Sequence, residues 1–415
     1  MTYPVETAKT SPGWNVIPSK LTALVMDMKT SSEEQTSWGR LCIEFLLCFA
    51  IAGRVFGYQI GILNVLGLSG AIIAASGFAC FVIMLARREP LPISLLFAVI
   101  INGIANLTDL YHIGLFNRDL IYWTSFLLMA CYIVRNKWAA WRFGCFLAAT
   151  VLISVVLSGS FLGTSGGFER LALSGRGVGQ MFANANDLAQ LALVVGVALL
   201  FSSLRLGLVA KLICWGTFLA LSAVVLLTLS RQGLFMLGCG FIFFLLASLK
   251  GKGKIGVIAL AFLALALAGL NSERLENIVS GYEYRLSLPS ARVAYWESAP
   301  REMMDTLISG RGTFDSFTAE GIKPHSTFLW LHLAYGGPCA WIYAGWILYL
   351  MVKTIQLVFG REAEWTVRME VAAMFSLFFL AQFTTVFAPG NYGFILAVAT
   401  LEREFTAKTN PQVET

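Results

Sequence analysis

Three points in the sequence place arginine or histidine at the edge of an apolar run. Arg176 lies in the glycine-rich run S-G-R-G-V-G, Arg231 lies in L-S-R-Q-G, and His325 lies in P-H-S-T-F-L. The guanidinium group is a planar fork of donors that suits phosphate, whereas a neutral imidazole offers a nitrogen that can accept a proton. These residue types therefore favour binding of a phosphate group, with a histidine as base or hydrogen-bond acceptor.

Each of these side chains also has a structural interpretation, and the sequence alone leaves both open. An arginine at the end of a membrane helix can reach lipid phosphates, and Asn184 or His325 at a helix start can cap free backbone amides. His332 lies two turns after His325 on the same helix face, so we interpret it as a buried hydrogen-bonding residue.

The elements that must position these residues are membrane-spanning helices. The chain has 415 residues, of which 57% are hydrophobic and 13% charged, whereas soluble globular proteins carry about 25% charged residues. Apolar stretches of suitable length predict an all-α, polytopic integral membrane protein with about twelve transmembrane helices. The expected spans lie near Leu41–Gly57, Ile62–Leu85, Leu91–Leu107, Leu115–Val134, Phe143–Leu162, Leu188–Leu204, Leu212–Leu229, Gly233–Leu249, Ile255–Leu270, Thr327–Val352, Val371–Phe387 and Tyr392–Leu401.

The charges between these spans predict how the chain crosses the membrane. With a cytosolic N-terminus and every span crossing, basic residues such as Arg87, Arg135 and Lys250 fall on the cytosolic side. This is the positive-inside bias. Both termini then lie in the cytosol, with tails at residues 1–40 and 406–415 on either side of a membrane domain at 41–405.

The opposite face collects arginine rather than lysine. Its longest connection, 271–325, has aromatic residues at a spacing typical of helices, so we expect an ordered periplasmic helical loop. Positive charge on outer loops is also tolerated without a function, and this alternative stays open. The basic residues on this face are Arg54, Arg118, Arg170, Arg176, Arg231, Arg274, Arg285, Arg292, Arg301, Arg311 and Lys323.

Four short motifs follow one another between Gly163 and Leu350. Two positions within these motifs, Ala185 and Ser326, differ from the family pattern named below, which has proline and asparagine there. The motifs are Arg176 followed by F-A-N-A-N-D-L-A from Phe182, T-L-S-R-Q-G from Thr228, Arg292 and Trp296 followed by a turn at Asp305–Gly312, and His325 with Ser326. In this order they resemble the O-antigen ligase and polymerase family of bacterial membrane glycosyltransferases.

The resemblance implies a function and its partners. An undecaprenyl-diphosphate-linked glycan would be transferred to an acceptor sugar hydroxyl in O-antigen, lipopolysaccharide or exopolysaccharide assembly. The enzyme would lie in the bacterial inner membrane with its active site facing the periplasm. It would need neither a metal nor another cofactor. The expected partners are the lipid-linked donor, a glycan or lipid A core acceptor and membrane lipid, with no nucleic acid.

The resemblance also implies roles for particular residues. Arg176, Arg231 and Arg292 would bind the diphosphate, with Arg285 and Arg301 as weaker candidates. His325 would accept the proton of the acceptor hydroxyl or orient that hydroxyl. A polymerase is favoured over a ligase that joins the chain to the lipid A core, because the motifs are generic to the family. A transporter or flippase for the same lipid-linked sugar is the more distant alternative.

Overall fold

The computed structural model describes most of the predicted membrane domain. Helices, turns and short connections make up the described residues, and no strand occurs among them. The chain divides into two units, Met1–Cys42 and Ile43–Thr415. The tail at 1–40 and the predicted span Ile255–Leu270 lie outside the described residues. These residues are 41–48, 63–116, 118–157, 185–228, 230–249, 279–280, 283, 299–312, 326–360, 363–382 and 392–409.

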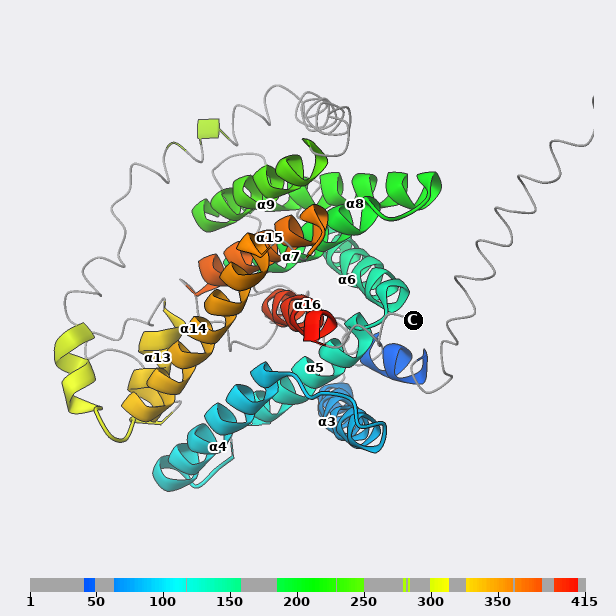
Figure 1. Ribbon diagram of the computed structural model, residues 1–415. Coiled ribbons are helices and arrows are strands. Elements are labelled where there is room, and N and C mark those ends of the chain that lie inside the picture. The colour runs from blue at the N-terminus through cyan, green and yellow to red at the C-terminus, as the bar shows by residue number, and fades with distance from the viewer. Residues whose placement is uncertain are drawn as a thin grey trace, which may run out of the picture. The chain divides into compact units, whose positions relative to one another are not determined.

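The helices of the second unit (Figure 1) overlap predicted spans, but several boundaries differ. α6 and α15 begin at Lys137 and Trp365, each six residues before the predicted start, and the last helix continues to Thr409, beyond the predicted start of the tail at 406. The bounds are α3 Leu63–Ala86, α4 Ile93–Ile113, α5 Arg118–Val134, α6 Lys137–Leu157, α7 Ala185–Ser203, α8 Leu208–Leu227, α9 Arg231–Leu249, α13 Thr327–Tyr335, α14 Gly337–Phe359, α15 Trp365–Ala381 and α16 Tyr392–Thr409.

Several of these helices suit a lipid bilayer. In the described part of the chain, four are long and apolar enough to cross a membrane: Ile93–Ile113, Leu208–Leu227, Arg231–Ser248 and Gly337–Phe359. Shorter apolar helices accompany them in α3, α5 and α7. The protein is therefore all-helical and membrane-embedded, and the larger count of about twelve spans stays a prediction.

A buried tryptophan marks the place where four helices meet. Trp346 of α14 is fully buried, and its ring lies 5.9 Å from Trp123 of α5, 6.3 Å from Phe378 of α15 and 5.9 Å from Phe394 of α16, measured between centroids. All three contacts are edge-to-face, which the charge distribution of aromatic rings favours. In lipid, such close packing rather than water exclusion holds helices together.

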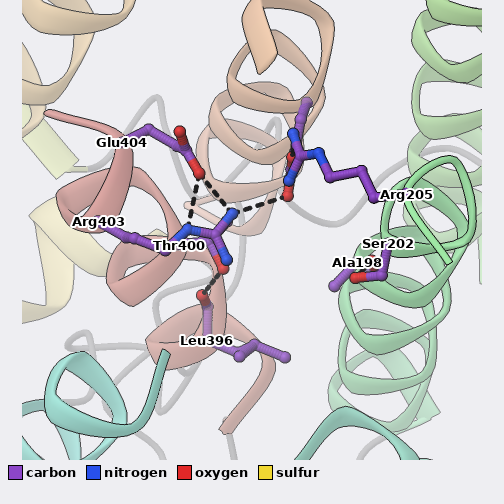
Figure 2. Close-up of polar contacts among 8 residues, drawn as sticks. Ala198, Ser202, Arg205, Leu396, Thr400, Arg403 and Glu404 are labelled. Carbon is purple, nitrogen blue, oxygen red and sulfur yellow. Dashed lines mark hydrogen bonds and ion pairs between the residues drawn. The ribbon is translucent and has the colours of Figure 1, made fainter. Parts of the chain in front are cut away.

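Ion pairs join the helices at one end of the unit. Arg403 of α16 donates to Glu404 over 2.7 Å and to Glu370 of α15 over 3.1 Å. Arg205, which follows α7, donates to the other oxygen of Glu370 over 2.9 Å. Figure 2 shows Arg403 at the centre of this group. Buried charges are costly unless they are paired, so these pairs explain how Glu370 can lie 3% exposed between helices.

Two further ion pairs join residues that the charge pattern places on the cytosolic side. Arg142 binds both carboxylate oxygens of Glu44, at 3.0 and 2.9 Å, and Arg135 pairs with Glu89. Each pair connects two segments that the alternation of spans puts on the same face. The contacts of the structure are therefore compatible with that alternation.

One predicted span is wrong as a continuous helix. The run Thr327–Val352 is divided at Gly336, where φ is +90°, into α13 and α14. Two features cause the break. Gly336 adopts a left-handed conformation that other residues avoid, and the Gly337 amide donates to the Leu307 carbonyl oxygen over 3.1 Å instead of continuing α13. The membrane-crossing helix therefore begins at Gly337.

Candidate functional site

Residues 299–312 of the long connection dock on the end of α13. The amides of Arg311 and Gly312 donate to the carbonyl oxygens of Leu333 and Ala334 over 2.8 and 2.9 Å. The last carbonyl groups of a helix have no hydrogen-bond donors within that helix. The amides of the docked segment provide these donors. Residues 299–305 of this connection are helical, whereas the aromatic residues that led to the prediction of an ordered loop at 271–325 lie outside the described residues, so that prediction stays a prediction.

Two glycines, Gly310 and Gly312, make this docking possible. Gly312 has a φ of +85°. Gly310 approaches α13 so closely that a Cβ atom built on it would lie 2.1 Å from the carbonyl oxygen of Ala334. A side chain at position 310 would therefore push the segment away from the helix.

Gly310→Ala is expected to destabilise the protein by about 2 kcal/mol or more, since overpacking against backbone cannot be relieved by a rotamer change. The measurement is the thermal unfolding midpoint of the detergent-solubilised protein. Gly103→Ala in α4 is the matched control, because nothing lies within 4 Å of a Cβ atom there. Equal midpoints for wild type and Gly310→Ala would contradict the close approach.

Side-chain contacts reinforce the docking. Thr306 Oγ1 lies 3.1 Å from His332 Nδ1, and both residues are buried. Arg311 donates to the buried carboxylate of Glu302 over 3.1 Å. The interpretation of His332 as a buried hydrogen-bonding residue is confirmed. Burial lowers the pKa of His332, which favours its neutral ring.

Arg231 begins α9 directly after a capped turn. The hydroxyl oxygen of Ser230 accepts from the Gly233 amide over 3.0 Å, and Ser230 is fully buried. Arg231 itself is half-buried. A helix start carries partial positive charge, so an arginine there does not favour the helix. An anion at this position would be attracted both by the guanidinium group and by the helix end.

The end of α15 contacts the second motif and the residue that follows the fourth, and the first motif packs on the second. Gly233 packs so closely on α7 that a Cβ atom built on it would lie 3.0 Å from the Ala189 Cβ. Gln232 donates to the carbonyl oxygen of Leu380 in the last turn of α15. The Thr327 amide, at the start of α13, donates to the Gln382 carbonyl oxygen over 3.2 Å. Ala189, Gln232 and Thr327 belong to, or directly follow, the first, second and fourth motifs.

The third motif joins this group through α13. Its turn at Asp305–Gly312 packs on the C-terminal end of that helix, whose first residue lies two positions after His325. Segments that are far apart in the sequence are therefore linked by direct contacts around α13 and α15.

The predicted site residues have different outcomes. Arg231 lies in the group just described. Arg301 is exposed on the helical turn that carries the buried Glu302. The other four lie outside the described residues: Arg176, Arg285, Arg292 and His325.

Sequence reasoning missed two polar residues of this region. Tyr343 and Gln382 are buried and bond one another by their side chains. Their only signal in the sequence is polarity inside an apolar stretch, which many membrane helices share.

Comparison of the chain with protein-family models, curated proteins and solved structures gives no significant match. The support for a function therefore comes from the motifs and from the contacts between them.

Proposed function

We propose that the protein is a membrane glycosyltransferase of the O-antigen ligase and polymerase type. It would transfer a glycan from undecaprenyl diphosphate to an acceptor sugar hydroxyl at the periplasmic face of the bacterial inner membrane. About twelve spans and two cytosolic termini would complete its architecture. The supporting observation is the contact of motif-bearing segments around α13 and the last turn of α15.

The proposed reaction has a simple balance. The acceptor hydroxyl oxygen attacks the anomeric carbon of the donor, while the bond from that carbon to the diphosphate oxygen breaks. The hydroxyl proton passes to His325, and the diphosphate leaves with the bonding electron pair. The negative charge that grows on the diphosphate must be stabilised for the reaction to proceed. Each fixed hydrogen-bond donor placed at such a charge lowers the activation free energy by about 3 kcal/mol.

The arginines would meet that charge. Arg231 is already held at a helix start, where the helix dipole adds to its attraction for an anion. Arg176 and Arg292 would join it on the diphosphate, with Arg285 and Arg301 as weaker candidates. The exposed position of Arg301 suits a contact at the rim of the site rather than at its centre.

A transporter or flippase for the same lipid-linked sugar is the second candidate. The ion pairs of Arg403, Glu370 and Arg205 favour it, because they tie three helices at one end and could form a gate. An enzyme needs no such opening. The two functions differ in their product, since only the enzyme makes a new glycosidic bond.

The deciding experiment incubates purified protein in lipid vesicles with a lipid-linked repeat unit. We expect longer lipid-linked chains and released undecaprenyl diphosphate. Movement of the lipid across the bilayer without a new glycosidic bond, either to a second repeat unit or to an added lipid A core acceptor, would contradict the enzyme and support the transporter. Polysaccharide from a deletion strain then separates the two enzymes: a polymerase mutant accumulates single repeat units, whereas a ligase mutant accumulates long lipid-linked chains.

A further inference from the structure

Three apolar side chains are exposed on the docked segment 299–312. Met304, Leu307 and Ile308 are 70%, 52% and 81% exposed. They lie at the end of the helical stretch 299–305 and in the bend that follows it, next to α13 (Figure 1). We call these three side chains the rim patch. Exposed apolar side chains that lie together indicate a contact with a protein or with a membrane.

The other side of the same segment is buried against protein. Glu302 and Thr306 are buried, and each has a polar partner. Arg311 donates to the Glu302 carboxylate over 3.1 Å, and Thr306 Oγ1 lies 3.1 Å from His332 Nδ1. These contacts fix which side of the segment faces α13. The rim patch therefore stays on the outer side, whatever lies against it.

Two membrane-spanning helices fix the depth of the segment. The Gly337 amide, at the start of α14, donates to the Leu307 carbonyl oxygen over 3.1 Å. A Cβ atom built on Gly312 would lie 3.5 Å from the Cγ1 atom of Ile113, the last residue of α4. Both helices are long and apolar enough to cross a membrane. The 23 residues of α14 rise by about 34 Å, slightly more than the hydrocarbon core of about 30 Å. The segment therefore lies at the boundary between hydrocarbon and headgroups.

The neighbouring helix ends carry the side chains that favour this boundary. Tyr111, in the last turn of α4, and Trp341, one turn into α14, are both strongly exposed. Tyrosine and tryptophan are enriched where a membrane meets water, because each joins an apolar ring to a polar group. Arg301 and Asp305 are exposed on the docked segment itself. The rim patch is thus continuous with lipid-facing helices and has charged residues beside it.

We propose that the rim patch enters the acyl region of the leaflet at this end of α4 and α14. The segment 299–308 would then lie in the membrane interface rather than in the water outside it. Arg301 and Asp305 would remain among the lipid headgroups, as the charged residues of interfacial helices do. The inference concerns bilayer lipid, and it holds for an enzyme and for a transporter alike.

The test places a genetically encoded, environment-sensitive fluorescent residue at position 308 of the full-length protein. The protein is reconstituted in vesicles of phosphatidylethanolamine and phosphatidylglycerol. One quencher is a phosphatidylcholine with a spin label near the head of its acyl chain, and the other is iodide on both sides of the membrane. We expect the lipid quencher to lower the emission more than about twofold and iodide to have little effect, since an interfacial side chain lies about 5–10 Å into the headgroup and acyl boundary.

The matched control carries the same fluorescent residue at Asp305, which is exposed within the same turn. Iodide should quench this position strongly. Position 304 serves in place of 308 if that variant is poorly folded, because Met304 belongs to the same patch. Quenching of position 308 by iodide alone would place the patch in water and overturn the inference. Protection from both quenchers would mean that protein, such as a second copy of the chain, covers the patch, and this would overturn it as well.

Discussion

Replacing His325 with alanine is expected to lower kcat for chain extension about 100- to 10,000-fold, the contribution typical of a positioned general base. The acceptor hydroxyl would keep its proton until late in the attack. His332 is buried against Thr306, and His112 is exposed at the end of α4. The measurement is the initial rate of chain extension by the purified variant at saturating donor.

Two other histidine variants make this result specific. His112→Ala should keep the wild-type rate, because the proposed reaction does not use it. His332→Ala removes a buried partner of Thr306 and should lower the thermal unfolding midpoint, whereas His325→Ala should leave that midpoint unchanged. Wild-type polysaccharide from cells that carry only His325→Ala would remove this residue from the mechanism.

Hydropathy was sufficient to place most of the helices. The predicted span near Leu91 corresponds to α4, and the one near Gly233 corresponds to α9, because an apolar run of bilayer length has few alternatives to a helix. The ends are less well predicted. α8 begins at Leu208 rather than Leu212, since Lys211 continues the helix although it lowers the local hydropathy.

The division between α13 and α14 escaped the sequence for a different reason. Gly336 lies inside an apolar run, and hydropathy does not register a left-handed backbone conformation. The break depends on the Leu307 carbonyl oxygen, which belongs to the distant docked segment. A property that two segments create together cannot be read from either one alone.

The residues of the candidate site were also only partly predictable from the sequence. Arg231 was recognisable because it stands between two apolar runs within the motif T-L-S-R-Q-G. Tyr343 and Gln382 were not, since their meaning comes from a contact between α14 and α15 with the start of α13. Sequence motifs thus indicated which segments matter, whereas the residues that align those segments became visible only in three dimensions.

Arg231→Lys is expected to lower kcat/KM for the lipid-linked donor about tenfold to 100-fold, although it keeps the positive charge. Lysine offers a point charge and cannot hold two phosphate oxygens with a planar pair of donors. Arg231→Ala should lose about 100- to 1000-fold, the range for removal of one donor from a transition-state charge. Arg292→Lys is expected to follow the same order, and rates at several donor concentrations separate kcat from KM.

The control for charge geometry is the substitution Arg88→Lys. Arg88 is exposed after α3 on the opposite predicted face, so this substitution should leave the rate unchanged. Full activity of Arg231→Lys would show that a point charge suffices, and full activity of Arg231→Ala would exclude this residue from diphosphate binding. A loss in kcat rather than in KM carries the most information. The donor diphosphate is already anionic in the ground state, and a further negative charge develops on it only as the glycosidic bond breaks. A contact that acts mainly on this further charge raises the barrier when it is weakened, whereas a contact that binds the ground-state charge mainly raises KM.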